Sequence, residues 1–70
     1  MTPQPGQIWR HRNGIPYRIL FIANEWSTNP AYPPTVVYYT DNRPAEHAAR
    51  WARPLHDWHR SMTLVEDAMP

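Results

Sequence analysis

Proline is the residue that most restricts how this chain can fold. The sequence holds nine prolines and only two glycines. Proline lacks a backbone N–H and clashes with the preceding helical turn, so it breaks the interior of a helix. Prolines at positions 3, 5, 16, 30, 33, 34, 44 and 54 leave no room for a long helix. The sequence therefore predicts short strands joined by turns.

Runs rich in β-branched and aromatic residues lie between these prolines, which is typical of strands. The predicted strands are residues 7–12, 17–24, 35–40, 50–53 and 60–65. Asn13-Gly14 predicts a two-residue hairpin turn with φ > 0 at both positions. The predicted connections are loops at 27–34 and 41–48, with one helical turn at 45–49, and a 3₁₀ turn at 55–59. That last segment is too short for an ordinary α-helix.

Five short strands with one 3₁₀ turn before the last strand predict a mainly-β fold, a small five-stranded SH3-like barrel. The 70 residues form a single domain, with a core between residues 6 and 65 and short termini at 1–5 and 66–70. A domain of this size buries only about 60% of the surface of its unfolded chain, so its stability is small. Cysteine is absent, which excludes disulfides.

No stretch of the sequence predicts a membrane or secretory segment. Apolar runs are shorter than the roughly 20 residues that span a bilayer. The first residues lack the basic and apolar regions of a signal peptide. We therefore expect a cytoplasmic protein with no membrane partner, and host cytoplasm if the chain is phage-encoded.

Arginine supplies all of the positive charge. The seven basic residues are all arginine, and the net charge is +1. So small a charge argues against non-specific binding to duplex nucleic acid, whose affinity comes mainly from phosphate neutralisation. Arginines interleaved with Trp and Tyr suit single-stranded nucleic acid. They equally suit solvated strand faces that prevent aggregation. The arginines concerned are Arg10, Arg12, Arg18, Arg50 and Arg60.

Two segments combine aromatic, His and Arg residues at the spacing of a strand. Trp9 and His11 share one face of the first strand, and Trp51 and Arg53 share one face of the fourth. If these faces converge, they form an aromatic pocket with one imidazole and one guanidinium. The candidate binding residues are Trp9, His11, Tyr17, Tyr38, Trp51, Arg53 and Trp58.

Two interpretations of this set stay open. As a pocket, it would stack an aromatic ring and hold an anionic group. As a core, its Trp and Tyr rings would fill the interior, with His11 and Arg53 bonded to backbone carbonyls or a carboxylate. Pro54 fixes the chain directly after Arg53, so we expect this guanidinium to be held by its surroundings in either case.

Catalytic and metal-binding patterns are weak. Ser27 and Ser61 lie outside any nucleophile motif, and the carboxylates form no acid–base pair. His56 and His59 can share one side of a helical turn, but a metal site usually needs three or four ligands. The sequence therefore predicts no enzyme activity, no metal and no cofactor.

The second predicted strand is apolar on both faces. Strict alternation places Tyr17, Ile19 and Phe21 on one face and Leu20 and Ile22 on the other. A strand of this kind is either covered on both sides or part of a subunit contact. We therefore expect a homodimer or higher homo-oligomer that buries Leu20 and Ile22.

Three motifs follow one another along the chain. They are Trp9-Arg10-His11-x-x-Gly14-x-x-Tyr17, then Val36-Val37-Tyr38, then Trp51-x-Arg53-Pro54-Leu55-x-x-Trp58. Their order and spacing resemble the family catalogued as domain of unknown function 1653, which comprises short bacterial and phage proteins. The resemblance covers residues 6–65 and implies a compact β-barrel without an established reaction.

The sequence departs from the family pattern at Gly6, at Trp9 and Trp58, and in the unusually proline-rich loop at 27–34. Gly6 lies three residues before Trp9 instead of two, so we expect a bulge at the entry to the first strand. Trp stands at 9 and at 58, where Tyr and Phe are commoner. These departures leave the three motifs in register.

Composition, motifs and resemblance together predict a small non-enzymatic binding module of bacterial or phage origin. Its expected action is protein–protein interaction or regulation of a host protein, since SH3-like barrels bind through exposed aromatic grooves. One alternative is a protein that holds or sequesters a nucleotide-like, aromatic anionic small molecule. The other is single-stranded nucleic-acid binding.

Overall fold

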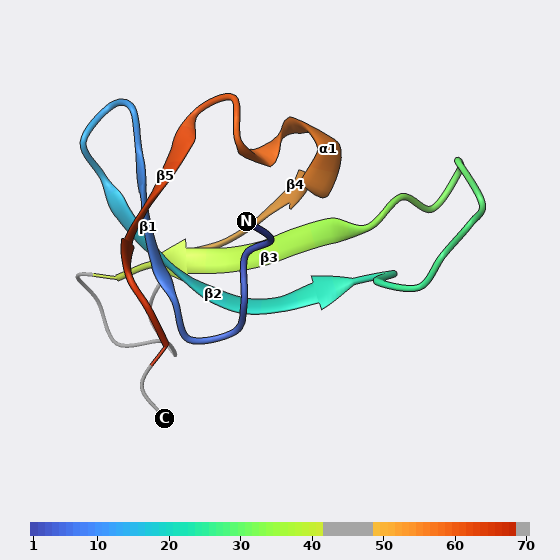
Figure 1. Ribbon diagram of the computed structural model, residues 1–70, viewed down its shortest axis with the longest axis horizontal. Coiled ribbons are helices and arrows are strands. Elements are labelled where there is room, and N and C mark those ends of the chain that lie inside the picture. Colours follow the sequence, from blue (N-terminus) through green and yellow to red (C-terminus); the bar gives the residue numbers. More distant parts are fainter. Residues whose placement is uncertain (42–48, 69–70) are drawn as a thin grey trace.

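One antiparallel sheet runs through most of the chain in the computed structural model, which describes residues 1–41 and 49–68 (Figure 1). The strands are β1 (Ile8–His11), β2 (Pro16–Ala23), β3 (Thr35–Thr40), β4 (Arg50–Pro54) and β5 (Met62–Glu66), and the helical turn α1 (Leu55–Trp58) precedes β5. Their order in the sheet is β4-β3-β2-β1-β5. The predicted mainly-β fold with five strands is confirmed.

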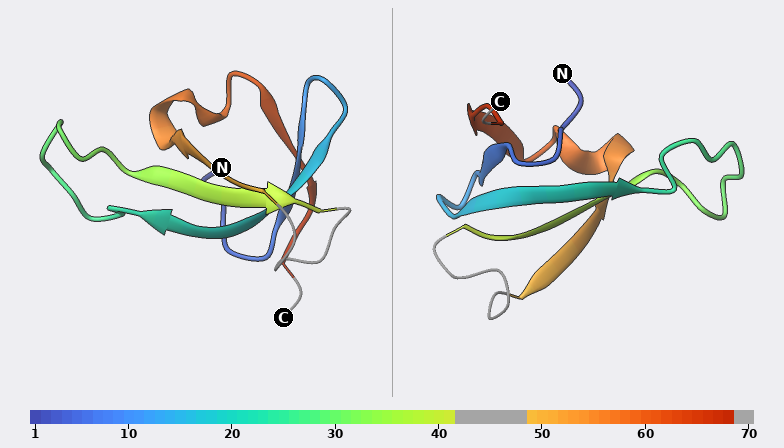
Figure 2. Two further views of the ribbon diagram at one scale, coloured as in Figure 1. Left: turned by 180° about the vertical axis from the view of Figure 1, so that it is seen from behind. Right: turned by 90° about the horizontal axis from the view of Figure 1, so that it is seen from below.

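The sheet is bent but not closed. Figure 2 shows α1 and β5 on one side of β2, while β4 turns away on the other side. Among the described residues, β4 pairs only with β3, and β5 pairs only with β1. Both strands are therefore edges of the sheet.

The predicted strand bounds are close to the observed ones. β3 has the predicted bounds, β4 ends one residue later than predicted, and β1 and β2 differ from their predicted bounds by one residue at both ends. β5 begins two residues later than predicted, because Arg60 and Ser61 belong to the turn after α1. The predicted turn at 41–48 and the helical turn at 45–49 lie, apart from their outermost residues, outside the described part of the chain.

The 3₁₀ prediction for the segment after β4 was wrong, because α1 is a single α-helical turn. Contacts at both ends of α1 stabilise this turn despite its short length. The Leu55 amide donates to the Pro34 carbonyl at 2.9 Å, and Trp58 is fully buried. Tertiary contacts thus hold a turn that would not be stable alone.

The β1–β2 hairpin has a three-residue loop, and not the predicted two-residue turn. The Gly14 amide donates to the His11 carbonyl at 2.8 Å, and the His11 amide donates to the Ile15 carbonyl at 3.0 Å. These bonds describe a type I turn followed by a glycine bulge. Accordingly, only Gly14 has positive φ, at 95°, whereas Asn13 does not. The Asn13 side chain instead accepts the Ile15 amide at 3.0 Å.

A bulge in β2 overturns the predicted alternation of its side chains. The register with β3 shifts between Ile19 and Phe21, which leaves Leu20 as the extra residue. Ile19 and Ile22 therefore both face the core, and Phe21 points outward with 51% of its area exposed. Ile22 is not on an outer face with Leu20, so the pair cannot form the contact surface predicted from strict alternation.

A second register irregularity lies where β1 begins, between Ile8 and Trp9 in the pairing with β5. That irregularity leaves Val65 of β5 as the extra residue.

A separate glycine bulge precedes β1, as expected from the spacing between Gly6 and Trp9. The Gly6 amide donates to the Ile19 carbonyl at 2.9 Å, the Ile19 amide donates to the Gln7 carbonyl at 2.9 Å, and Gly6 has a φ of 88°. The buried Gln7 stabilises this entry: its Oε1 accepts from Trp9 Nε1 at 3.0 Å, and its Nε2 donates to Asp67 Oδ1 at 2.6 Å. The two terminal segments of the domain are therefore linked through one amide.

The core lies inside the bend of the sheet. Its buried residues come from four elements of the sheet and from α1, and they are Trp9, Ile19, Val36, Trp58 and Met62. Partly buried residues surround them, namely Tyr17, Ile22, Tyr38, Leu55 and Leu64. Aromatic rings form the centre of this core. Further aromatic rings, those of Tyr17 and Tyr38, lie at its margin and are partly exposed.

Candidate binding surface

Three aromatic side chains form a row across β2, β3 and β4 on the core side of the sheet. Trp51 is the register partner of Tyr38, so both project from the same face. The ring centroids of Tyr38 and Tyr17 lie 5.1 Å apart, edge to face. Half of the Trp51 area is exposed. We call Tyr17, Tyr38 and Trp51 the aromatic face.

Trp9 and Trp58 lie beneath this row and belong to the core. Trp58 is fully buried, and its ring centroid lies 5.0 Å from that of Tyr38. Trp9 is 3% exposed and lies 5.7 Å from Trp58, again edge to face. A ligand on the outside cannot touch either indole. Their contribution is a rigid support for the exposed rings.

Arg53 is held in place, as the sequence predicted. It follows Trp51 by one strand step and pairs in register with the buried Val36. Its Nε lies 3.1 Å from Asp57 Oδ2, and one terminal nitrogen lies 3.5 Å from Ser61 Oγ. Arg60 approaches the other oxygen of Asp57 at 2.6 Å. The Arg53 guanidinium is therefore engaged within the domain, where Asp57 balances its charge.

Tyr38 keeps its proton at neutral pH. Burial raises the pKa of its hydroxyl above the ordinary value, the charge of Arg53 lowers it, and Tyr17 raises it further. Burial dominates because the ring is packed between Trp58 and Tyr17. The aromatic face therefore presents a neutral hydroxyl at Tyr38.

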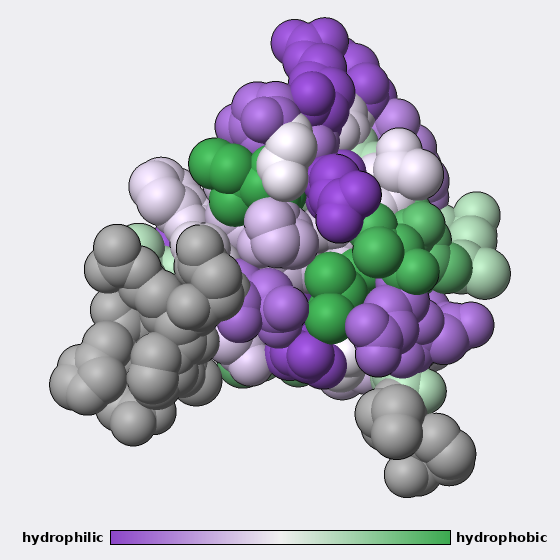
Figure 3. All heavy atoms as spheres, turned by 90° about the vertical axis from the view of Figure 1, so that its left-hand side faces the viewer, coloured by the Kyte–Doolittle hydropathy of each residue, from purple (hydrophilic) through white to green (hydrophobic). Residues whose placement is uncertain are grey.

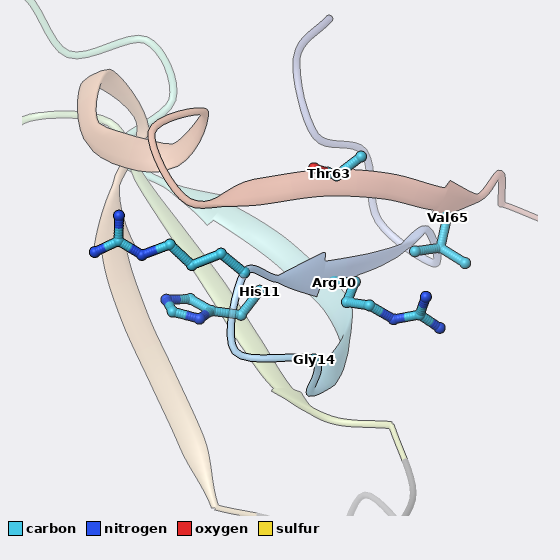
Figure 4. Close-up of a pocket in the computed structure, with 6 residues that line it drawn as sticks. Arg10, His11, Gly14, Thr63 and Val65 are labelled. Carbon is cyan, nitrogen blue, oxygen red and sulfur yellow. The ribbon is translucent and has the colours of Figure 1, made fainter.

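His11 does not join the aromatic face. Its Nδ1 accepts the Asn13 amide at 3.0 Å, which helps to order the β1–β2 hairpin. With residues of β1, the hairpin and β5, it lines a separate hollow of about 250 Å³ (Figure 4). Of the seven predicted residues, the structure thus brings six together around Tyr38 and places His11 elsewhere.

The described residues, 1–41 and 49–68, contain no cluster of metal ligands. No group of three His, Asp or Glu side chains there can hold a metal ion. His59 packs edge to face on Trp9, with ring centroids 5.6 Å apart, and its Nε2 contacts the Met1 carbonyl. Its partner in the predicted pair, His56, is exposed on α1.

Sequence reasoning missed the most exposed aromatic residues. Trp26 and Tyr32 lie in the β2–β3 connection and expose 89% and 61% of their areas. A signal was present, because Trp26 follows the end of a strand and precedes the turn-forming pair Asn29-Pro30. A large apolar side chain in a segment that cannot be core is a candidate contact residue.

Comparisons with protein-family models, with curated proteins and with solved structures gave no match to this chain. Within residues 1–41 and 49–68, no helix has the length and apolar character needed to cross a membrane.

Proposed function

We propose that this protein is a non-enzymatic interaction module that binds an extended segment of a partner protein at the aromatic face. The observation that carries the proposal is Trp51, whose ring is half exposed beside Tyr38 although the core beneath is already filled by Trp58. Exposed Trp and Tyr on a rigid support are typical anchors of protein interfaces.

The chemistry of the surface favours a peptide over an anionic ligand. Asp57 forms an ion pair with Arg53, the guanidinium that shares a strand face with Trp51. The remaining groups are rings and neutral hydroxyls, which suit apolar and proline side chains. In addition, β4 has an open edge in the described part of the sheet, so an extended chain beside Trp51 can reach backbone groups there.

The finer fold and origin are part of the same proposal. The helical turn between β4 and β5 and the bend of the sheet support an SH3-like barrel. The three ordered motifs support membership in the domain of unknown function 1653 family, and hence a bacterial or phage origin and a cytoplasmic site of action. Analogy with SH3-like barrels supports an aromatic groove as the binding surface.

A random-peptide display selection against the wild-type domain tests this proposal. Selected peptides should bind the wild type and lose about tenfold or more in affinity for Trp51→Ala, as expected for an anchor residue. Phe21→Ala is the matched control, because Phe21 is equally exposed but points outward from the sheet. Equal affinity for wild type and Trp51→Ala would overturn the assignment of this face.

The same proteins should be titrated with a nucleotide panel and with single-stranded oligonucleotides. Stabilisation by a ligand grows with its concentration relative to Kd, reaching about 2.7 kcal/mol at 100 times Kd. Saturable stabilisation that Trp51→Ala abolishes, without any peptide binding, would replace the peptide proposal with a small-molecule or nucleic-acid function.

A further inference from the structure

The connection between β2 and β3 is an ordered arm that projects from the body of the domain. Figures 1 and 2 show residues 24–34 extending beyond the end of the sheet. The Ser27 amide donates to the Asn24 carbonyl at 3.0 Å, and the Tyr32 amide donates to the Asn29 carbonyl at 2.9 Å. Asn29 Oδ1 also accepts the Ala31 amide at 3.0 Å. Two successive turns therefore order the arm in the free protein.

The arm presents two large rings to solvent. Trp26 is 89% exposed and Tyr32 is 61% exposed. A preordered backbone reduces the entropy lost when such rings are buried in a contact. Glu25, directly before Trp26, is the only ionisable acid or base within residues 24–34 apart from the Tyr32 hydroxyl. The arm is therefore an aromatic anchor with one negative charge.

A hollow lies at the opposite end of the molecule, beside the β1–β2 hairpin and β5 (Figure 4). Its volume is about 250 Å³, and its lining residues are Arg10, His11, Arg12, Gly14, Thr63 and Val65. Pockets for drug-sized ligands measure about 300–1,000 Å³, so this hollow suits a single large side chain.

The hollow is basic at its rim and partly apolar. Arg10 and Arg12 are exposed, and neither has a carboxylate within 4.0 Å in the described part of the chain, where the ion-paired arginines are Arg18, Arg53 and Arg60. Val65, on β5, exposes 47% of its area. Figure 3 looks at this end of the molecule and shows hydrophobic atoms bordered by strongly hydrophilic ones.

We infer that the arm of one copy docks into the hollow of a second copy of this chain. Trp26 would pack against Val65 with the Arg10 guanidinium over its ring, a cation–π arrangement, and Glu25 would pair with Arg12. The charges of the two surfaces are opposite, and the size of the hollow matches one anchor side chain. The arm lies at the other end of the molecule from the hollow (Figure 1), so it can reach only another copy's hollow.

Other occupants fit less well. An anionic membrane surface attracts basic segments, whereas the arm contains no Lys or Arg. Self-association also adds stability to a domain of 70 residues that has no disulfides. The inference is independent of the proposed peptide function, because the arm and the hollow share no residue with the aromatic face.

A contact between two different surfaces has a consequence for assembly. Each copy retains a free arm or a free hollow after the first contact, so the chain forms a closed ring or an open row of copies. An isologous dimer would instead stop at two copies.

Light scattering on separate and mixed variants tests this inference. The wild type should assemble at about 50–500 µM, the range of weak self-association. Trp26→Ala disables the arm and Arg10→Glu disables the hollow, and each should be monomeric alone. Mixed together, they should form a 1:1 dimer, because the intact arm of the Arg10→Glu protein can bind the intact hollow of the Trp26→Ala protein. Phe21→Ala should assemble like the wild type.

Each other outcome overturns the inference. A monomeric wild type excludes self-association, and a Trp26→Ala protein that still assembles excludes the arm. Two monomeric variants that fail to pair when mixed exclude docking of the arm in the hollow. Far-UV circular dichroism of each variant confirms that folding is retained, as expected for exposed positions. None of these outcomes alters peptide binding at Trp51, so the two proposals fail separately.

Discussion

Trp9 and Trp58 are almost fully buried, whereas Trp26 and Trp51 expose 89% and 50% of their areas. The rings of Trp9 and Trp58 pack edge to face on each other at the centre of the core, and Trp58 also packs edge to face on Tyr38. The exposed pair stands on two different elements, the arm and the edge strand β4. The difference teaches that aromatic residues here serve two purposes. The buried pair stabilises the domain, and the exposed pair is free for contacts.

The largest expected effect is that of Trp58→Ala, which tests the buried half of the comparison. Removing a fully buried indole costs about 3–5 kcal/mol, a large part of the stability of so small a domain. The variant should be mostly unfolded in urea titrations followed by circular dichroism. Trp58→Phe should lose much less, because Trp58 Nε1 has no hydrogen-bond partner among residues 1–41 and 49–68, so its removal breaks no hydrogen bond there. A wild-type transition midpoint for Trp58→Ala would contradict its role in the core.

The next effect concerns Arg53, which lies between the buried and the exposed rings. Arg53→Ala leaves the half-buried Asp57 with one partner fewer and should cost about 1–3 kcal/mol. Arg53→Lys should not restore the loss, because an ammonium cannot place one nitrogen on Asp57 and another towards Ser61. Chemical denaturation of the three proteins measures both steps. A Lys variant as stable as the wild type would show that charge alone suffices.

A smaller effect is the alkaline stability set by Tyr38. Its pKa in the folded state is raised, chiefly by burial. The unfolded chain therefore releases this proton first, so the stabilisation is complete below the ordinary Tyr value near 10 and is lost as pH rises through the folded pKa. Tyr38→Phe should flatten the decline in the free energy of unfolding above that pH. Tyr32→Phe, in the exposed arm, should leave the decline as in the wild type.

The smallest expected effect sharpens the exposed half of the comparison. Trp51→Ala and Trp26→Ala should each change the free energy of unfolding by no more than about 0.5 kcal/mol, as is usual for exposed side chains. The measurement is again urea denaturation, at concentrations low enough to exclude self-association. A loss above 2 kcal/mol for either variant would place that indole with the buried pair.

Local sequence patterns predicted the bounds of the strands well. They predicted less well which side chains share a face of a strand. β3 has its predicted bounds because a run of β-branched and aromatic residues is enclosed by Pro34 and Asp41. The bulge at Leu20 could not be predicted, since it arises from the pairing of β2 with β3 and leaves no local mark. It changes the faces of Phe21 and Ile22, and with them the predicted contact surface.

The sequence predicted which residues gather at the candidate site. It did not predict which of them are buried and which are exposed. Spacing correctly placed Trp51 and Arg53 on one face, and their register partners Tyr38 and Val36 bring them to the core. The sequence contains nothing that distinguishes Trp58 from Trp51 in exposure, because that depends on the side of the sheet covered by α1. Trp26 was not among the predicted site residues, because its exposure depends on the projection of residues 24–34 from the sheet, which is a feature of the fold.

The pairing of β1 with β5 also determines how the chain can fold. Its partners include Ile8 with Glu66 and His11 with Met62, and the bond between Gln7 and Asp67 joins residues 60 positions apart. The outer edge of β1 is therefore paired only once β5 has joined the sheet. Synthesis has to pass β5 before the core can close, so the domain folds as one unit. Such non-local pairing is typical of folding in milliseconds to seconds, well behind helical domains of the same length.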